Sequence, residues 1–336
     1  MSPPQPVGVL GAGSWGTALA ALIARNGHPV TLWSREPAHA DDLAMHRTNR
    51  RYLPQLRLPE GLAVTSDLAG LCQTTRDFVI AVPSHGFEAT LTVVRQHAKE
   101  PLRLCWGTKG FEPVSGRLPS EVLDTIMPAD SVIPAVVSGP SFAGEVALGM
   151  PTALTVGCQN QEAGHAIADW FRNERVRVYS ATDLVGIQLG GALKNVMAIA
   201  TGICDGLALG ANARAALITR ALAEMIRLGV ALGGQSQTFV GLTGVGDLML
   251  TATDNQSRNR RLGLGIGAGR KINALIDEIG QEIEGIQTAR VLFDKSRALQ
   301  IQMPITEQVY RVMFENLDPA AAVTDLLSRA PREESD

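Results

Sequence analysis

The first apolar segment of the chain runs directly into a glycine-rich turn. Residues 7–10, VGVL, read as a short strand, and the following GAGSWG places Gly11, Gly13 and Gly16 at the spacing G-x-G-x-x-G. A helical pattern, TALAALIARNG, comes next. In such a unit one glycine turns the chain, one lets a pyrophosphate approach the backbone, and one lets helix and strand pack closely. The N–H groups at the helix N-terminus can then bind the anion, so this stretch predicts a dinucleotide site. The alternative is a chance glycine turn.

The end of the second strand bears on which dinucleotide is bound. This strand, PVTLW at residues 29–33, ends in Ser34 and Arg35, where an NAD-selective site usually carries Asp or Glu for the ribose 2′-hydroxyl. The guanidinium of Arg35 instead suits a 2′-phosphate. We therefore expect NADPH or NADH as cofactor, with NADP preferred; the alternative is a solvated surface arginine.

Further apolar segments read as strands and predict an α/β domain. The continuous apolar run at residues 77–84 is typical of a strand covered on both faces, as in a parallel sheet. Residues 38–59 depart from this pattern as a polar helical excursion, which Pro54 and Pro59 prevent from continuing. The segments read as strands are LAVTSDL, DFVIAVPS, LRLCWGTKGF, AVVSGPSFAGEVALG, TALTVGC and RVRVYSATD.

Polar side chains follow several of these strands, where the ligand crevice of an open α/β sheet lies. Ser84, His85 and Phe87 are candidates to border the cofactor, with ordinary loop residues as the alternative. Lys109, between two glycines, is placed to meet a phosphate or carbonyl oxygen as a compact charge. The turn SGPS at residues 138–141 offers small residues and hydroxyls against which a ligand could lie.

From about residue 185 helical periodicity replaces the strand pattern. A chain of 336 residues is also too long for one ordinary domain. We therefore expect an N-terminal α/β domain with a mainly parallel sheet over residues 1–184. An all-helical domain is expected over residues 185–336.

One lysine stands in the middle of the apolar helix GGALKNVMAIATGICD at residues 190–205. Burial would remove solvation from the ammonium group of Lys194 and lower its pKa toward the range in which it exchanges protons. Asp247 and Thr251, four residues apart in a helical pattern, would share a face and could point at one partner. The alternatives are an ion pair within a helix bundle, or a lysine whose head reaches water.

A second polar cluster combines a hydroxyl, a guanidinium and an amide at Ser257, Arg258 and Asn259. This set suits phosphate oxygens, since arginine can bind them in bidentate fashion and small polar groups fill the remaining acceptors. The alternative is a solvated turn before Arg260 and Arg261.

Charge and composition limit the partners. With 30 basic and 33 acidic residues and a net charge of -3, the chain has no global field that favours nucleic acid or an anionic membrane. We expect no transmembrane segment, because the longest apolar stretches are interrupted by Lys194, Asn195 and Asp205. The start, MSPPQPV, lacks the charged and apolar regions of a signal peptide, so we expect a cytoplasmic protein. No Cys-x-x-Cys spacing occurs, so we expect no metal site and four buried thiols, namely Cys72, Cys105, Cys158 and Cys204.

Together these motifs resemble one family, the bacterial NAD(P)-dependent glycerol-3-phosphate dehydrogenases. The resemblance runs over nearly the whole chain, through GAGSWGTALA, NRRYLP, WGTKGFEP, SGPSFAGEVALGMPTA, GGALKNVMAIATGICDGLALGANARAALITRALAEM, GLTGVGDLMLTATDNQSRNRRLG and MPITEQVY. It implies a Rossmann-type domain, an all-helical domain, an active site between them and a homodimer. The implied activity interconverts dihydroxyacetone phosphate and sn-glycerol 3-phosphate, supplying phospholipid synthesis.

The resemblance also implies roles for individual residues. Lys194 matches the proton donor and acceptor of the family. The positions that match substrate contacts are Lys109, Gly139, Ser141, Lys194, Asp247, Ser257, Arg258 and Asn259. The positions that match the cofactor site, beside the three glycines, are Ser14, Trp15, Arg35, Lys109, Ala143, Arg258 and Glu284.

The chemistry of the residues agrees with such a reaction. Lys194 would give a proton to the carbonyl oxygen in reduction and remove it in oxidation. Lys109 would add positive charge at the same oxygen or hold substrate, and Asp247 with Thr251 would orient Lys194. Arg258, with its two polar neighbours, would hold the phosphate.

Two alternatives stay open. A 3-hydroxyacid or 6-phosphogluconate type dehydrogenase joins similar domains and uses a lysine, but acts on carboxylates; Lys109 and the run at residues 257–259 favour a small phosphate. The second alternative is a nucleotide-responsive binding protein that kept the fold and lost the catalytic activity. The presence of Lys194, Lys109 and Asp247 argues against it.

Overall fold

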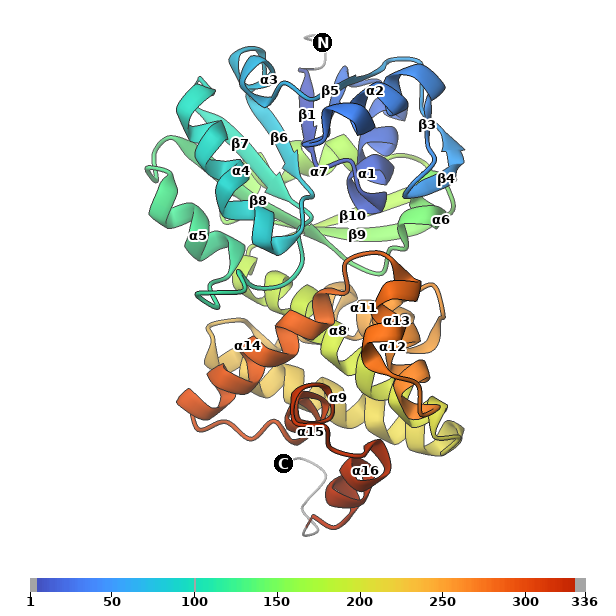
Figure 1. Cartoon of the computed structure of the whole chain (residues 1–336). Helices are drawn as coiled ribbons and strands as arrows, with labels where there is room; N and C mark the ends of the chain where they lie inside the picture. Colours follow the sequence, from blue (N-terminus) through green and yellow to red (C-terminus); the bar gives the residue numbers. More distant parts are fainter. Residues whose placement is uncertain (1–4, 100, 330–336) are drawn as a thin grey trace.

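The computed structural model describes residues 5–99 and 101–329, and it joins a sheet-containing N-terminal half to a helical C-terminal half (Figure 1). Within the described residues the main sheet has eight strands, in the order β10-β9-β8-β7-β6-β1-β2-β5. Their bounds are β1 (Val7–Leu10), β2 (Val30–Trp33), β5 (Leu62–Thr65), β6 (Asp77–Ile80), β7 (Leu102–Trp106), β8 (Val132–Ser138), β9 (Thr152–Gly157) and β10 (Val176–Ala181). Each segment that the sequence predicted as a strand contributes one of them.

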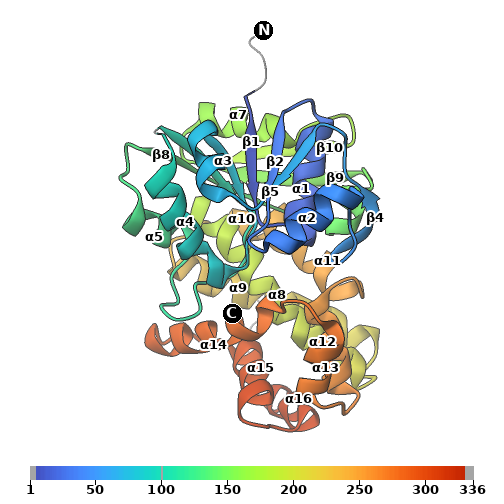
Figure 2. The same ribbon diagram turned by 45° about the horizontal axis from the view of Figure 1, so that its top comes forward.

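The sheet is mainly parallel, as predicted. The six strands from β8 to β5 run in one direction, whereas β9 pairs with β8 in the antiparallel sense and β10 runs parallel to β9. The carboxyl end of β1 points toward the helical half (Figures 1 and 2). The chain passes from β1 to β2 on one side of β1, and the later strand β6 pairs with β1 on its other side. Because the strand order reverses at this point, the ligand crevice of such a sheet is expected at this end, between β1 and β6.

Helices cover both faces of the sheet. One apolar core contains residues of α1 and α7, such as Leu19 and Ile167, and a second contains residues of α3, α4 and α5, such as Leu91. The helices of this half are α1 (Ser14–Arg25), α2 (Pro37–His46), α3 (Leu68–Thr74), α4 (Ser84–His97), α5 (Pro119–Ile126), α6 (Ala143–Ala147) and α7 (Gln161–Phe171).

The excursion at residues 38–59 contains a hairpin that the sequence did not predict. Helix α2 ends at His46, because Arg47 adopts a left-handed conformation with φ of 54°. An antiparallel pair follows, formed by β3 (Thr48–Asn49) and β4 (Leu53–Arg57). Pro54 lies inside β4, in a small two-stranded sheet where a missing N–H group is tolerated.

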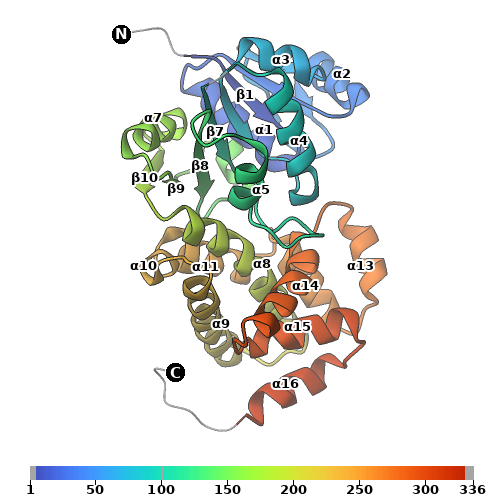
Figure 3. The same cartoon turned by 90° about the vertical axis from the view of Figure 1, so that its left-hand side faces the viewer.

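The helical half is organised around α8 (Leu184–Gly206), with the other helices packed about it (Figure 3). By length and composition α8 could cross a membrane, but 94% of its most apolar window is buried inside the protein. It is therefore the core helix of this half. The remaining elements are α9 (Ala211–Ala231), α10 (Ser236–Phe239), the π-helical turn η1 (Leu242–Gly246), α11 (Asp247–Thr253), α12 (Arg258–Gly267), α13 (Ile272–Ile279), α14 (Glu284–Ala298), α15 (Pro304–Phe314) and α16 (Pro319–Leu327).

Helix α12 lies against α8 through glycines. A side chain at Gly202 of α8 would collide with the carbonyl oxygen of Arg260, and one at Gly263 of α12 would collide with that of Ile199. The two backbones therefore touch directly. This close crossing fixes the start of α12 near the middle of α8, where Lys194 lies.

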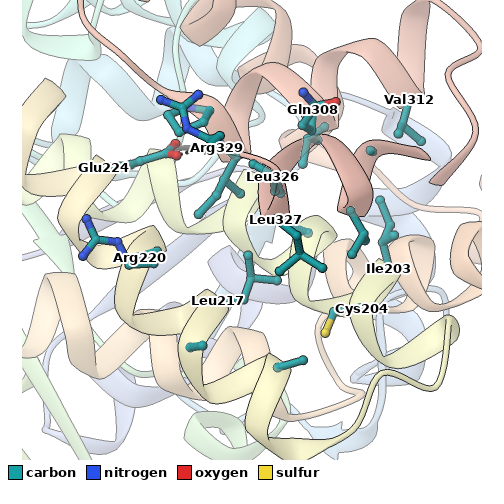
Figure 4. A pocket seen from close by; sticks show the side chains of 18 of the residues that line it. Ile203, Cys204, Leu217, Arg220, Glu224, Gln308, Val312, Leu326, Leu327 and Arg329 are labelled. Atoms are coloured by element: carbon teal, nitrogen blue, oxygen red, sulfur yellow. Dashed lines mark hydrogen bonds between the residues drawn. The ribbon is translucent and has the colours of Figure 1, made fainter. Parts of the chain in front are cut away.

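A cavity of about 460 Å³ lies inside the helical half, between α8, α9, α15 and α16 (Figure 4). Apolar side chains such as Ile203 and Leu217 line much of it, together with the carboxyl group of Glu224. Glu224 is only 2% exposed, and it accepts hydrogen bonds from the backbone N–H groups of Ile305 (2.6 Å) and Thr306 (3.3 Å). Burial raises the pKa of Glu224 to about 7. This carboxyl group thus caps the beginning of α15.

The cysteines are free and buried, as expected from their spacing; they are Cys72, Cys105, Cys158 and Cys204. Burial raises the pKa of the Cys105 thiol well above its usual value, which keeps it neutral.

Candidate active site

The glycine-rich turn after β1 has the geometry that its spacing predicts. Gly11 adopts φ of 114°, in the left-handed region that favours glycine, and a side chain at Gly16 would collide with the carbonyl oxygen of Gly11. Apart from Gly13 and its chain neighbours, no atom of the described residues lies within 4 Å of the position that a Cβ of Gly13 would take. The turn therefore has open space at its middle glycine, where a pyrophosphate would approach.

This turn opens into a cleft of about 1130 Å³ between the sheet and the helical half. The cleft brings together these predicted cofactor residues: Gly11, Gly13, Ser14, Trp15, Arg35, Arg258 and Glu284. The indole N–H of Trp15 is buried and has no hydrogen-bond partner among the described residues. Buried donors are normally paired, so this one and the open space at Gly13 fit an extended dinucleotide.

The other predicted cofactor residues lie close by, outside the lining of this cleft. Gly16 is buried beneath the turn, and Ala143 is the first residue of α6, which packs on α1. Lys109 lies in the loop after β7.

Three charged side chains meet between the two halves. Asp247 accepts hydrogen bonds from Lys109 Nζ through Oδ2 (2.8 Å) and from Lys194 Nζ through Oδ1. Lys194 also donates to Thr251 Oγ1 (3.0 Å), which lies one helical turn beyond Asp247. Lys194 is 6% exposed and Asp247 is 1% exposed. The predicted pairing of Lys194 with the Asp247 and Thr251 face of α11 is present in the structure.

The two lysines share one carboxylate, but their pKa values shift in opposite directions. Burial lowers the pKa of Lys194 to about 7, against the attraction of Asp247, and the positive charge of Lys109 lowers it further. Burial acts on Lys109 in the same sense, but the Asp247 carboxylate outweighs it and raises the pKa of Lys109. Burial would raise the pKa of Asp247, yet the two ammonium groups lower it. Near neutral pH, Lys194 can therefore exchange protons while Lys109 keeps its charge.

Close backbone approaches bring these residues together. A side chain at Gly190 would collide with the carbonyl oxygen of Thr243 in η1, the turn that leads into Asp247. A Cβ at Gly191 would lie 3.2 Å from Ser138 Oγ and 3.6 Å from the side chain of Lys109. The glycine pair before Lys194 therefore lets α8 approach both η1 and the loops after β7 and β8.

The turn after β8 borders this group. Gly139 has φ of 138°, and a Cβ there would lie 2.9 Å from the carbonyl oxygen of Ala153. Ser141 donates a hydrogen bond to the carbonyl oxygen of Gly139 (2.9 Å), which closes the turn. The hydroxyl of Ser138 is buried and lacks a partner among the described residues. It is an unused polar group beside Lys109.

The run at residues 257–259 begins helix α12, so it is not a solvated turn. Ser257 caps the helix by accepting from the N–H of Arg260 (3.2 Å). Asn259 is buried, donating to Asn195 Oδ1 (3.1 Å) and accepting from the N–H of Gly285 (3.0 Å). Arg258, half-buried, is the member of the trio that lines the cleft.

Glu284 lies in the same cleft, and both its burial and the neighbouring positive charges shift its pKa. Burial raises the pKa of Glu284, and the positive charges of Arg258, Lys109 and Lys194 oppose this. Arg258 and Glu284 thus connect the dinucleotide cleft with the lysine group.

Two buried polar residues near the site, Asn195 and Arg260, were not predicted from the sequence. Asn195 follows Lys194 and donates to Glu284 Oε2 (3.3 Å), so it ties α8 to the start of α14. Arg260 is buried and paired with Asp205 Oδ2 (2.6 Å), whereas the sequence analysis gave it only as one of two basic residues after the run at residues 257–259. The sequence signal that could have indicated both was the amide of Asn195 and the carboxylate of Asp205 within the otherwise apolar helix α8.

The prediction for Phe87 was wrong. Helix α4 begins at Ser84, so Phe87 turns into the core, where its ring packs edge-on against Trp106 with 6.0 Å between centroids. His85 does line the cleft, and Ser84 lies near Gly110 in the loop that carries Lys109.

A dinucleotide turn on a mainly parallel sheet, facing a buried Lys–Asp–Lys group on a helical half, defines the class of two-domain NAD(P)-dependent dehydrogenases. Two family models then match the chain. The one described as NAD-dependent glycerol-3-phosphate dehydrogenase N-terminus covers residues 6–164, and the corresponding C-terminus covers residues 183–324. The chain belongs to the NAD-dependent glycerol-3-phosphate dehydrogenase family.

Individual relatives agree with this assignment. The glycerol-3-phosphate dehydrogenase [NAD(P)+] of Methylococcus capsulatus is 53% identical over 331 residues, which cover 98% of each chain. That of Thioalkalivibrio sulfidiphilus is 48% identical and covers 99% of this chain and 100% of the relative. A crystal structure of glycerol-3-phosphate dehydrogenase from Coxiella burnetii superposes with a TM-score of 0.93 at 45% identity, covering 97% of this chain and 99% of that one.

Proposed function

We propose that this protein catalyses the reversible reduction of dihydroxyacetone phosphate to sn-glycerol 3-phosphate with NADPH or NADH. The observation that carries this proposal is the environment of Lys194. This lysine is buried, donates hydrogen bonds to Asp247 and Thr251, and has its pKa lowered to about 7. The substrate is inferred from its relatives, which are glycerol-3-phosphate dehydrogenases.

The residues around Lys194 have distinct roles in this proposal. When bound, the nicotinamide supplies hydride to the carbonyl carbon in reduction or accepts it in oxidation. Lys194 gives a proton to the oxygen that becomes the hydroxyl group, and takes it back in the reverse direction. Lys109 keeps its charge and stabilises the developing negative charge, while Asp247 and Thr251 hold the lysine heads in place.

The substrate phosphate belongs at the start of α12 in this proposal. Arg258 lines the cleft there, and Ser257 and Asn259 flank it. The turn containing Gly139 and Ser141 closes the site beside Lys109. Lys109, Lys194 and Asp247 then act at the carbonyl end of the substrate.

Oxidation of NADPH and of NADH, followed by absorbance in the presence of dihydroxyacetone phosphate, tests the function. We expect loss of signal that depends on the phosphate substrate, and much slower loss with dihydroxyacetone, which lacks the phosphate. Turnover of a 3-hydroxyacid or 6-phosphogluconate without turnover of dihydroxyacetone phosphate would contradict the proposal.

We also propose the finer assignments that the sequence suggested. Arg35 lies exposed at the rim of the cleft, where it can meet a 2′-phosphate, so NADPH is preferred over NADH. Residues 1–184 bind the cofactor, residues 185–336 complete the substrate site, and two copies form a homodimer. The product supplies glycerophospholipid synthesis.

Replacing Arg258 with Ala should raise the KM for dihydroxyacetone phosphate by about 10²-fold, with a smaller effect on kcat, because a charge-assisted hydrogen bond to phosphate is lost. Steady-state kinetics at fixed NADPH measure this. Arg261 on the same helix is exposed, so Arg261→Ala is the matched control and should leave the KM unchanged. An unchanged KM in Arg258→Ala would refute the phosphate role.

A further inference from the structure

One end of the dinucleotide cleft is formed by two segments that lie apart from the Lys109, Asp247 and Lys194 group. The loop between β2 and α2 contributes Ser34, Arg35 and Glu36, and the turn of the β3–β4 hairpin contributes Arg51 and Tyr52. Because it lies past the carboxyl end of β2, this end faces the adenosine ribose of a bound dinucleotide. The hairpin is therefore a second wall of the adenosine site.

The hairpin is held firmly against the glycine-rich turn. The side chain of Asn49 donates to the carbonyl oxygen of Ala12 (2.9 Å) and to Thr17 Oγ1 (2.8 Å). The hydroxyl of Ser14 donates to the carbonyl oxygen of Tyr52 (2.9 Å). The position of the hairpin tip is thus fixed by the same turn that is expected to hold the pyrophosphate.

The loop after β2 carries two neighbouring residues of opposite charge, Arg35 and Glu36, which favour different cofactors. A carboxylate about 20 residues after the glycine-rich turn suits the 2′-hydroxyl of NAD, and Glu36 stands at this spacing. An arginine there suits the 2′-phosphate of NADP, and Arg35 precedes Glu36 directly. An unpaired Glu36 carboxylate would repel the phosphate that Arg35 attracts.

Arg51 pairs with that carboxylate. Its Nη1 lies 3.1 Å from Glu36 Oε2, and its guanidinium carbon lies 5.0 Å from the centre of the Tyr52 ring. Both charged side chains remain more than half exposed, so the pair sits at the open rim of the cleft. The ring and the fixed hairpin hold the guanidinium over Glu36.

We propose that the Glu36–Arg51 ion pair sets the cofactor selectivity of this protein. Arg51 neutralises the Glu36 carboxylate and so permits a 2′-phosphate beside Arg35, while Glu36 remains available to a ribose 2′-hydroxyl. The inference rests on the proposed function only in the identity of the cofactors. Arg51 is a positioning residue here, because it acts on the cofactor through Glu36.

The test is the ratio of Kd values for NADH and NADPH, measured by titration of the purified chain with fluorescence detection. Arg51→Ala should lower the preference for NADPH by about tenfold, because a carboxylate is left unpaired beside a phosphate. In a Glu36→Gln background the same Arg51→Ala change should alter the ratio by about twofold or less, since no charge remains to neutralise. Arg51→Lys keeps the charge and should retain most of the preference.

Arg50 supplies the matched control. It lies next to Arg51 in the hairpin and is similarly exposed, but it pairs with Asp42 and does not belong to the cleft lining. Arg50→Ala should leave the ratio unchanged. The effect of Arg51→Ala should also shrink as salt is raised, because the screening length between exposed charges falls from about 10 Å at 0.1 M to about 3 Å at 1 M ionic strength.

Two results would overturn the inference. No change of the ratio in Arg51→Ala would remove any role in selectivity. An equal loss in the parent and Glu36→Gln backgrounds would show that Arg51 does not act through Glu36. Because the measurement is of binding, its outcome is independent of whether dihydroxyacetone phosphate is turned over, which tests the proposed function separately.

Discussion

Replacing Lys194 with Ala should lower turnover in both directions by roughly 10²- to 10⁴-fold, the usual contribution of a positioned proton donor or acceptor. Lys194 Nζ is held by Asp247 and Thr251 at the junction of the two halves, and burial lowers its pKa to about 7. Within the site described, Lys109 cannot replace it readily, because Asp247 raises the pKa of Lys109 and keeps it charged.

Steady-state assays with NADPH and dihydroxyacetone phosphate, together with direct titration of NADPH, measure this effect. Cofactor affinity should stay near the parent value, since Lys194 does not belong to the cleft lining around the glycine-rich turn. Lys194→Met keeps the length of the side chain without its charge and separates the chemistry from any cavity left by Ala. Lys271, exposed at the start of α13, supplies the control Lys271→Ala. Near-normal turnover in both Lys194 variants would refute the assignment.

Replacing Asp247 with Asn should affect both stability and turnover. The change leaves the buried ammonium group of Lys194 and the partly buried one of Lys109 without their shared carboxylate, and breaking a buried ion pair typically costs about 3–5 kcal/mol in the free energy of unfolding. Asp247 attracts the proton of Lys194, so its loss should lower the pKa of Lys194 further. At neutral pH less Lys194 is then protonated, and reduction should slow by about 10²-fold.

Denaturant unfolding and pH-dependent kinetics separate the two effects. If Asp247 acts on Lys194, part of the lost reduction rate should return as the pH is lowered, because Lys194 regains its proton. A purely structural role would leave the shape of the pH profile as in the parent. Asp254, exposed just after α11, supplies the control Asp254→Asn.

The strands, the glycine-rich turn and the polar face of one helix could be predicted from the sequence, because each is formed by residues close together in the chain. The eight strands follow from short apolar runs, and the glycine-rich turn follows from its spacing. The shared face of Asp247 and Thr251 follows from helical periodicity, and the structure places both beside Lys194.

Contacts between distant segments could not be read from the pattern. The bond from Lys109 to Asp247 joins residues 138 positions apart, and the burial of Arg260 depends on a carboxylate on another helix. The antiparallel pairing of β8 with β9 depends on a chain reversal that periodicity does not report. The β3–β4 hairpin was missed because strands of two and five residues are too short for an alternation to stand out.

The central claim is that Lys194 moves the proton, and the pH dependence of kcat/KM in the two directions tests it most directly. The lysine must be protonated to reduce dihydroxyacetone phosphate and neutral to oxidise sn-glycerol 3-phosphate. With a pKa of about 7, kcat/KM for reduction should therefore fall as pH rises through about 7, and kcat/KM for oxidation should rise over the same range. The residual activity of Lys194→Met should lack this opposed pair of limbs, which separates the lysine from titration of the substrate phosphate. Profiles that change in the same sense in both directions, or that persist unchanged in Lys194→Met, would contradict the account.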